Sequence, residues 1–468
     1  MRLKAEFAKA RVRRGCASVE QLKAALLREK READGTGSFV YPRWVRINNI
    51  CTTLEEQIRT TFSTYQRVDS IAELAPDDED QNAQRRLYID PNIPDLVAVP
   101  YGADFTSSTA YKKGEIILQD KASCFPAYLL LGDRGPSDAW EGDLVDGCAA
   151  PGNKTTHMAS LLAKQQNQKQ NQTKAKSQIF SMDASIMRSK TLQKMVSLAG
   201  ADSTVTVLPG QDFLALDPTD DRFANVSGLL LDPSCSGSGI IGRDDVPNLT
   251  LPRSAESNNT NSKSRGKKRK RKNDDDKEAA NSQTRSSEAP TTTSASDEND
   301  VPTGVVDQER LVKLSNIQAR IVEHALTFPN ATHVTYSTCS IHLIENECVV
   351  ARILTSDVAR QRGWRLLRRD EQPQGLRNWK HRGVRRDRAV ESAVGPEGGG
   401  ASVELPDEAL EACLRCWSGD AEGLGGFFVA GFVRDPQAAD ATVVNDSNHL
   451  EGDTSPEKDE EEWEGFSD

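Results

Sequence analysis

Short apolar runs alternate with longer amphipathic stretches along most of the chain beyond residue 140. The apolar runs predict strands, and a parallel sheet forms when such strands alternate with helices. The helices are expected from about Gly152 onward and over residues 184–199, where Gly200 ends the second one. The strands are expected at residues 143–147, 178–183, 204–210, 227–233 and 333–339. This alternation predicts an α/β fold with a doubly wound, Rossmann-like sheet.

A further helix and a closing pair of strands complete this pattern. The helix should have one apolar face, because its apolar residues recur at steps of three and four: Leu311, Leu314, Ile317, Ile321 and Ala325. Residues 364–367 and 425–434 are the expected closing strands.

Reactive and acidic residues gather at the predicted carboxyl ends of the parallel strands. They are Asp146, Asp183, Asp232 and Cys339. Ligands of doubly wound sheets bind beyond these strand ends, so the pattern predicts a single site at this edge.

The region before this core differs from it, and it predicts a smaller α+β domain. Residues 39–50, "FVYPRWVRINNI", form a strand-like run in which Trp44 lies between Arg43 and Arg46. Basic and aromatic residues interleaved on a strand suit contact with RNA, but an ordinary edge strand explains the composition equally well. We expect an RNA-binding region over residues 1–125, a catalytic domain over 126–435 and an acidic, disordered tail over 436–468.

Composition and charge narrow the class of protein. No apolar run is long enough to predict a membrane span. Nine scattered cysteines indicate reduced thiols in the cytosol or nucleus. Cys413 and Cys416 make a CxxC pair without further ligands nearby in the sequence, so we expect no metal site and place both cysteines one turn apart on a helix.

The net charge of −11 argues against non-specific binding of a polyanion by the whole chain. The basic residues are nevertheless concentrated in residues 263–272, "KSRGKKRKRK". This run lies in a polar segment, about 254–300, that we expect to be a disordered insertion. It is typical of a nuclear import signal or a phosphate-contacting patch, and a merely solvated charge run is the alternative.

The loop after the first strand of the core predicts a nucleotide-like ligand. In "DGCAAPGNKTTHMA" (146–159), small residues precede a helix N-terminus, which favours an anionic group. The loop matches neither a dinucleotide-binding nor a Walker motif. Asp183, at the end of the next strand, is suited to bind ribose hydroxyls. S-adenosylmethionine, a nucleoside with a carboxylate, fits both features.

Three motifs together resemble those of the RsmB/Sun family of RNA (cytosine-5) methyltransferases: "DGCAAPGNKT", "DPSCSGSG" and "YSTCS". The resemblance extends through most of the ordered chain and is strongest for the subgroup that modifies large-subunit rRNA in fungi and animals. Ser234 stands where the family often has proline, and the insertion after Gly242 is unusual. Relatives also have a longer helical N-terminal region, so we expect this sequence to be a truncated or minimal form.

The resemblance implies a role for each matched residue. Cys339 would be the nucleophile, Cys235 would serve product release, and Asp232 would lie between the cofactor and the target base. Asp183 and Arg188 would border the ribose, and Asp212 the adenine. The S-adenosylmethionine loop would comprise Cys148, Ala149, Ala150, Pro151, Gly152, Asn153 and Lys154.

The chemistry of cytosine methylation agrees with two cysteines and an acid at one edge. A thiolate that adds to carbon 6 makes carbon 5 nucleophilic, and an acid beside the ring nitrogen can take up the developing charge. These considerations alone leave open which cysteine attacks.

We therefore expect a monomeric rRNA methyltransferase of the nucleus and nucleolus that acts on pre-ribosomes and uses S-adenosylmethionine. A tRNA substrate and a non-catalytic role in ribosome assembly are the alternatives. A DNA methyltransferase is disfavoured, because the Pro-Cys-Gln motif of that class is absent from the sequence.

Overall fold

The computed structural model describes residues 41–75, 85–101, 103–134, 138–168, 177–240, 308–386 and 402–434, together with a few isolated residues before residue 23. Three of the sequence predictions lie outside the described residues: the insertion at 254–300, its basic run at 263–272 and the acidic tail at 436–468.

An eight-stranded sheet forms the larger part of the described chain. Its strands are β6 (Asp143–Asp146), β7 (Ile179–Asp183), β8 (Val205–Pro209), β9 (Val226–Leu231), β10 (His333–Thr338), β11 (Arg365–Leu366), β12 (Leu414–Cys416) and β13 (Phe427–Val433). The order is β11-β13-β10-β9-β6-β7-β8, and β12 also pairs with β13. The five strands from β8 to β10 are parallel, whereas β13 is antiparallel to its neighbours. The predicted doubly wound sheet and its closing pair are both confirmed.

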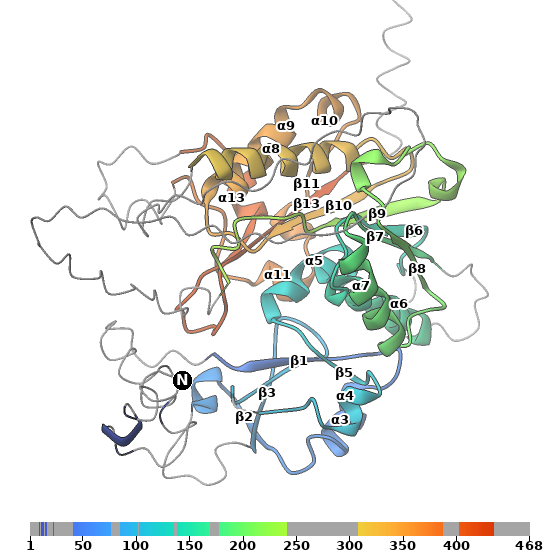
Figure 1. Ribbon diagram of the computed structural model, residues 1–468. Coiled ribbons are helices and arrows are strands. Elements are labelled where there is room, and N and C mark those ends of the chain that lie inside the picture. The colour runs from blue at the N-terminus through green and yellow to red at the C-terminus, as the bar shows by residue number, and fades with distance from the viewer. Residues whose placement is uncertain are drawn as a thin grey trace, which may run out of the picture. The chain divides into compact units, whose positions relative to one another are not determined.

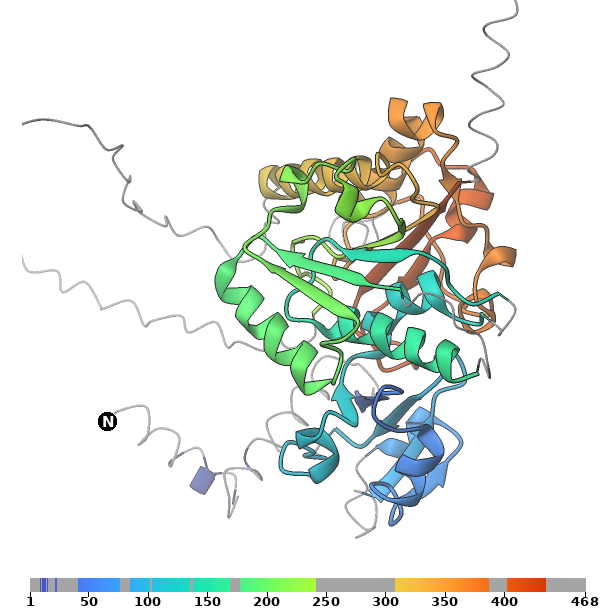
Figure 2. The same ribbon diagram turned by 90° about the vertical axis from the view of Figure 1, so that its right-hand side faces the viewer.

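Helices cover both faces of this sheet (Figures 1 and 2). One face carries α5 (Lys121–Leu131), α6 (Asn153–Gln168) and α7 (Ile186–Leu198), and the other carries α8 (Gln308–Ala325), α9 (Glu347–Thr355) and α10 (Asp357–Gln361). The remaining short helices lie in loops: η3 (Phe213–Ala215), η4 (Asp221–Phe223), η5 (Leu343–Glu345), η6 (Arg369–Glu371), α11 (Gln374–Arg377) and α13 (Asp407–Ala412). The central strands are almost wholly buried. Strand β9 ("VSGLLL") is largely apolar, whereas β10 ("HVTYST") also buries polar side chains.

The predicted apolar face of α8 is wrong at one position. Ile317 is 48% exposed, and the neighbouring Gln318 is fully buried instead. The buried amide donates to the carbonyl of Ser234 (3.0 Å) and to Oε1 of Glu345 (3.0 Å), so its polar atoms are satisfied inside the protein. The spacing of apolar residues assigned Ile317 to the buried face. It could not indicate that the polar Gln318 would be buried instead, because a glutamine does not contribute to an apolar pattern.

A second, five-stranded sheet is formed by residues before the catalytic core. Its strands are β1 (Arg43–Ile47), β2 (Gln66–Val68), β3 (Arg86–Ile89), β4 (Leu96–Val99) and β5 (Ile116–Leu118), in the order β2-β3-β4-β1-β5. The short helices α3 (Leu54–Arg59), η1 (Ile71–Leu74) and α4 (Thr109–Lys112) belong to the same region. The predicted α+β character of this region is confirmed.

The interpretation of residues 39–50 as an RNA-contacting strand is wrong for two of its three residues. Strand β1 is an interior strand, antiparallel to both β4 and β5. Trp44 and Arg46 are only 3% and 1% exposed, so neither can stack on a base or reach a phosphate. Arg43 remains partly exposed, with its guanidinium 6.0 Å from the ring of Tyr101.

Arg46 instead reaches helix α6, which begins in the S-adenosylmethionine loop predicted from the sequence. Its guanidinium donates to Gln119 Oε1 (2.7 Å) and to Thr156 Oγ1 (2.9 Å). Helix α5, which follows Gln119, packs against β10 and β13 of the larger sheet. The expected domain boundary at residue 125 falls inside this helix.

The CxxC pair does not lie on one helix, contrary to expectation. Cys413 follows the last residue of α13, and Cys416 ends strand β12. Both thiols are buried, and burial raises the pKa of each above its ordinary value. Within the described ranges, no cluster of three or more potential ligands could hold a metal ion. None of the helices described there is long and apolar enough to cross a membrane.

Candidate active site

The four residues predicted at strand ends meet at one edge of the larger sheet. Asp146, Asp183 and Cys339 end or follow β6, β7 and β10, and Asp232 follows β9. These strands are adjacent in the order β7-β6-β9-β10. The strands after β6 are added on one side of it and then, from β9 onward, on the other side, so the strand order reverses between β6 and β9. A ligand-binding crevice forms at such a switch point, which is where the candidate site lies.

The two cysteines predicted to be reactive lie against each other. The Sγ atoms of Cys235 and Cys339 are 3.0 Å apart, although the residues are separated by 104 positions. The loop that carries Cys235 is joined to the loop that carries Cys339 by a hydrogen bond from the Gly239 amide to the Cys339 carbonyl (2.9 Å).

Two glycines allow the loops to approach this closely. The Gly426 amide donates to the Gly239 carbonyl (2.8 Å). A Cβ atom on Gly239 would lie 2.1 Å from the Gly426 carbonyl oxygen, and one on Gly426 would lie 2.3 Å from the Ile341 side chain. A larger residue at Gly239 would displace the segment before β13, and one at Gly426 would displace the loop that carries Cys339.

Hydroxyl groups complete the connection between the loops. The Ser236 hydroxyl donates to that of Ser340 (3.1 Å), and the Ser238 hydroxyl accepts from the Ile341 amide (3.1 Å). Ser236 and Ser238 therefore join the loop of Cys235 to the loop of Cys339 and help to hold the thiol pair in place.

Asp232 is held between a cation and a hydroxyl. Its Oδ2 lies 2.7 Å from Lys154 Nζ, and its Oδ1 accepts from the Ser337 hydroxyl (2.8 Å). Lys154 also donates to the Ser123 hydroxyl (3.1 Å). Burial lowers the pKa of Lys154, but the charge and hydrogen bond of Asp232, together with the nearby Asp146 and Cys339, outweigh this and raise the pKa above its ordinary value. Lys154 is therefore a cation that fixes the Oδ2 atom of Asp232.

Ser337 and Ser123 are site residues that the sequence analysis missed. A signal was available for Ser337, since it lies two residues before Cys339 and alternate residues of a strand point to the same side. Ser123 lies in the first turn of α5 and carries no local signal, because only the tertiary structure brings it to Lys154.

The thiol pair is electrostatically unequal. The pKa of Cys339 is lowered, chiefly by its hydrogen bond with the Cys235 thiol, while burial and the charge of Asp232 act against this and Lys154 supports it. The pKa of Cys235 is raised, chiefly by the same hydrogen bond and also by burial. Cys339 is therefore the cysteine that ionises first, a distinction that the sequence alone left open.

The predicted cofactor loop lies next to this pair and is fixed by its backbone. The Gly147 amide donates to the Leu230 carbonyl (3.1 Å), and the Ala149 amide donates to the Met182 carbonyl (2.9 Å). Gly152 has a φ of +114°, and a Cβ there would lie 3.0 Å from the side chain of Met195. The loop thus passes close to α7, and its last residues, Asn153 and Lys154, begin α6.

Buried polar groups lie beneath the loop. Burial raises the pKa of Asp146 to about 7, although the Thr155 hydroxyl donates to its Oδ2 (2.6 Å). Burial likewise raises the pKa of Cys148, so this partly exposed thiol is mostly protonated at neutral pH. Ala149 and Ala150 are buried, whereas Pro151 is exposed.

Arg188 connects the loop to the acid at the end of β7. Its guanidinium donates to the Ala150 carbonyl (2.7 Å) and lies 3.3 Å from Asp183 Oδ2. Asp183 Oδ1 accepts from the Ser185 amide (2.9 Å), so this carboxylate is held in a fixed orientation.

The surroundings of Asp183 fit the adenosine part of S-adenosylmethionine. Ile186 and Met187, at the start of α7 three and four positions after Asp183, are 64% and 71% exposed. They offer an apolar surface of the kind on which an adenine ring stacks. Asp212, after β8, is exposed and accepts from the Leu214 amide (3.0 Å). Asp183 suits a ribose, Ile186 and Met187 suit the face of a base, and Asp212 suits the exocyclic amine of that base.

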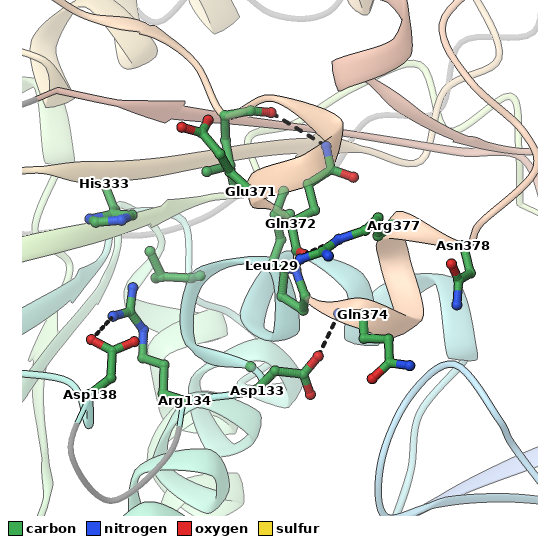
Figure 3. A pocket seen from close by; sticks show the side chains of 14 residues that line it. Leu129, Asp133, Arg134, Asp138, His333, Glu371, Gln372, Gln374, Arg377 and Asn378 are labelled. Atoms are coloured by element: carbon green, nitrogen blue, oxygen red, sulfur yellow. Dashed lines mark hydrogen bonds and ion pairs between the residues drawn. The ribbon is translucent and has the colours of Figure 1, made fainter.

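A separate cavity of about 770 Å³ lies at the opposite edge of the sheet (Figure 3). It is lined by His333, which begins β10, and by Asp133, Arg134 and Glu371. Since Cys339 follows the other end of β10, this cavity is not part of the candidate active site.

The fold and the site together define a Rossmann-like methyltransferase with a pair of cysteines at the switch point. Two family models match the sequence: "NOL1/NOP2/Sun domain family member 5, ferredoxin-like domain" over residues 41–119, and "16S rRNA methyltransferase RsmB/F" over residues 137–263. The first range coincides with the five-stranded sheet, and the second begins just before β6.

Full-length relatives agree with these matches. The chain is 35% identical to the 25S rRNA (cytosine-C5)-methyltransferase rcm1 of Schizosaccharomyces pombe, over 92% of this chain and 69% of that protein. It is 30% identical to a 28S rRNA (cytosine-C5)-methyltransferase of Mus musculus, over 92% and 70%. A methyltransferase homologue from Pyrococcus horikoshii has the same fold, with a TM-score of 0.51 and 17% identity over 92% of this chain and 99% of that one. The chain belongs to the RsmB/Sun family of RNA (cytosine-C5) methyltransferases.

Proposed function

We propose that this protein transfers the methyl group of S-adenosylmethionine to carbon 5 of a cytosine in large-subunit rRNA, through a covalent bond between Cys339 and the base. The observation that carries the proposal is the Cys235–Cys339 pair, 3.0 Å apart and next to Asp232 at the switch point of the sheet. The names of the relatives support the large-subunit substrate.

Cys339 starts the reaction. Its thiolate forms a bond to carbon 6, and the electron pair of the 5,6 double bond becomes available at carbon 5. The lowered pKa of Cys339 supports this assignment, because more of the thiol is ionised at neutral pH than in a free cysteine.

Asp232 and Lys154 act on the same base. Negative charge develops on a ring nitrogen as the thiolate adds to carbon 6. The carboxyl group of Asp232, in its protonated form, is suited to donate to that nitrogen. Lys154 and Ser337 keep the carboxyl group in one orientation, so that it need not rearrange during the reaction.

Cys235 serves the last step. After methylation, the proton at carbon 5 must leave and the bond from Cys339 to carbon 6 must break. The Cys235 thiol, whose sulfur lies 3.0 Å from the first, can give its proton to the departing Cys339 sulfur and in turn accept the proton from carbon 5, which regenerates the thiol.

S-adenosylmethionine supplies an electrophilic methyl group when it is bound. We propose that Asp183 binds its ribose, that Ile186, Met187 and Asp212 border its adenine, and that the loop from Cys148 to Lys154 surrounds its amino-acid part. Arg188 keeps Asp183 and the loop in register.

The five-stranded sheet is the proposed RNA-binding domain, over about residues 41–119, where the family model of the ferredoxin-like domain matches. The target cytosine must leave its stack to reach Cys339, so we expect a single-stranded or remodelled region of a pre-ribosome as substrate. We infer action in the nucleus and nucleolus, because the relatives modify eukaryotic large-subunit rRNA.

Bisulfite sequencing of total RNA tests this function. Cells that lack the protein should lose methylation at a cytosine of large-subunit rRNA, and the wild-type protein should restore it. Cys339→Ala should restore nothing although it still binds S-adenosylmethionine, whereas Cys51→Ala, a change of an exposed cysteine, should restore methylation fully. Loss at a tRNA cytosine would instead support the tRNA alternative. Full methylation in the absence of the protein would contradict the catalytic role.

A further inference from the structure

Three consecutive polar residues behind the thiol pair are fully buried. Glu345, Asn346 and Glu347 each have a relative exposure of 0% and link η5 to α9. Acidic and amide side chains are almost never buried so completely unless every one of them is hydrogen-bonded. Their partners therefore identify what they do.

Asn346 holds the two residues on either side of Cys339. Its Oδ1 accepts from the Thr338 hydroxyl (2.5 Å), and its Nδ2 donates to the Ser340 carbonyl (2.9 Å). The position of the Cys339 backbone is thus set from both sides by one amide group.

Glu345 holds the loop that carries Cys235. Its Oε1 accepts from the Ser236 amide (2.9 Å) and from Gln318 Nε2 (3.0 Å). The same Nε2 donates to the Ser234 carbonyl (3.0 Å). Both peptide groups that flank Cys235 are therefore bound by the Glu345–Gln318 pair.

Tyr336 fixes this pair in turn. Its hydroxyl lies 2.5 Å from the Glu345 carbonyl oxygen and 3.2 Å from Gln318 Oε1. Tyr336 belongs to β10, so the pair is attached to the strand that leads to Cys339.

Glu347 supports the Cys339 loop from behind. It forms a buried ion pair with Arg415, whose Nε donates to Glu347 Oε1 (2.7 Å) and whose Nη1 donates to the Ile341 carbonyl (2.8 Å). The guanidinium thus connects Glu347 to the residue two positions after Cys339.

We propose that residues 345–347 are positioning residues with different main roles: Asn346 holds Cys339 for attack, and Glu345, with Gln318, holds Cys235 for release. The inference rests on the proposed function. None of the three side chains contacts a sulfur; they act through the peptide groups beside the sulfurs. Because displacements of about 1 Å are enough to lower rates by orders of magnitude, such a clamp is kinetically important.

The two halves of the clamp predict opposite defects. Glu345→Met should leave a single round of methyl transfer near the wild-type rate and should slow multiple turnover by about tenfold or more, with a covalent protein–RNA adduct on denaturing gels. Asn346→Leu should slow methyl transfer itself by about tenfold or more, without accumulation of an adduct. The RNA would be a fragment of rRNA that spans the cytosine found by bisulfite sequencing.

Milder and matched variants separate these effects from misfolding. Gln318→Met should reproduce the release defect, Thr338→Val the attack defect, and Glu345→Gln, which keeps an acceptor oxygen, should restore release. Gln372→Met removes a buried glutamine that holds backbone carbonyls at the other edge of the sheet, and it should leave the adduct fraction unchanged. S-adenosylmethionine binding and melting temperature give the folded fraction of each variant.

Equal effects of the Glu345 and Asn346 variants on both steps, or no effect on either, would overturn the inference. Failure of the proposed function has a different signature. In that case the wild-type protein would not methylate the fragment, and neither Cys339→Ala nor Cys235→Ala would differ from it.

Discussion

At the scale of single residues, the decisive feature is the unequal pair of thiols. The chemistry read from the sequence calls for two cysteines but does not say which of them attacks the base. In the folded protein the two thiols are hydrogen-bonded to each other, and this bond lowers the pKa of Cys339 while it raises that of Cys235. The cysteine proposed to attack is therefore the more readily ionised of the two.

This asymmetry predicts a shift in pH dependence for Cys235→Ala. The substitution removes the hydrogen-bonding partner of Cys339, so the pKa of Cys339 should rise and the thiolate fraction at a given pH should fall. The pH of half-maximal adduct formation, measured from initial rates over about pH 6 to 10, should therefore move upward. Cys235→Ser, whose hydroxyl can still donate, should shift it less. An unchanged midpoint in both variants would show that the hydrogen bond does not control ionisation.

At the scale of elements, strand β1 connects the small sheet to helix α6, which begins in the proposed cofactor loop. Arg46 binds Gln119 and Thr156, and Gln119 Nε2 donates to the Ser123 carbonyl (3.0 Å). Ser123 in turn accepts from Lys154, which orients Asp232. A residue that resembled an RNA contact is thus part of the support of the active site.

Arg46→Met distinguishes these two roles. It leaves polar partners without a donor, so the free energy of unfolding should fall by about 1–3 kcal/mol in urea titrations. The salt dependence of RNA binding should stay the same, because no phosphate contact is lost. Arg59→Met, which changes an exposed arginine, should affect the free energy of unfolding by less than about 1 kcal/mol. A smaller salt slope for Arg46→Met would restore the RNA-contact interpretation.

At the scale of the whole molecule, a buried ion pair joins the two sheets. Lys121, in the first turn of α5, lies with Nζ 2.6 Å from Asp90 Oδ2 and donates to Asn92 Oδ1 (2.9 Å). Its ammonium group also lies 5.5 Å and 5.0 Å from the rings of Trp44 and Trp379. A charge buried among aromatic rings is stable only while its partner remains.

Lys121→Met should lower the free energy of unfolding by about 3–5 kcal/mol at neutral pH, because Asp90 is left buried and unpaired. Burial raises the pKa of Asp90, and Lys121 offsets part of this; without the lysine the pKa rises further. When folding raises the pKa of a carboxyl group, the protein becomes less stable as pH rises. The loss of unfolding free energy in the variant should therefore shrink toward acidic pH. Urea titrations at about pH 5 and pH 8 measure this. The double variant Lys121→Met/Asp90→Asn should recover much of the loss; a deficit independent of pH, or as large in the double variant, would contradict the explanation.

The sequence by itself determined the larger sheet, the positions of Asp146, Asp183, Asp232 and Cys339, and the class of chemistry. These features are local: alternating apolar runs place strands, and the residue after a strand lies at the sheet edge wherever that strand is inserted. The three motifs determined the family for the same reason, since each is a short contiguous stretch.

Only the tertiary structure decided which polar residues are buried and what they hold. Arg46, Gln318 and Glu345 are residue types usually found at the surface, and each has a partner far away along the chain, at separations of 73, 84 and 109 residues respectively. Periodicity reports whether a position is apolar; it does not report that a distant carbonyl or carboxylate will satisfy a polar group. The ionisation order of the thiols has the same origin, because it depends on a contact between two loops that the sequence separates by 104 positions.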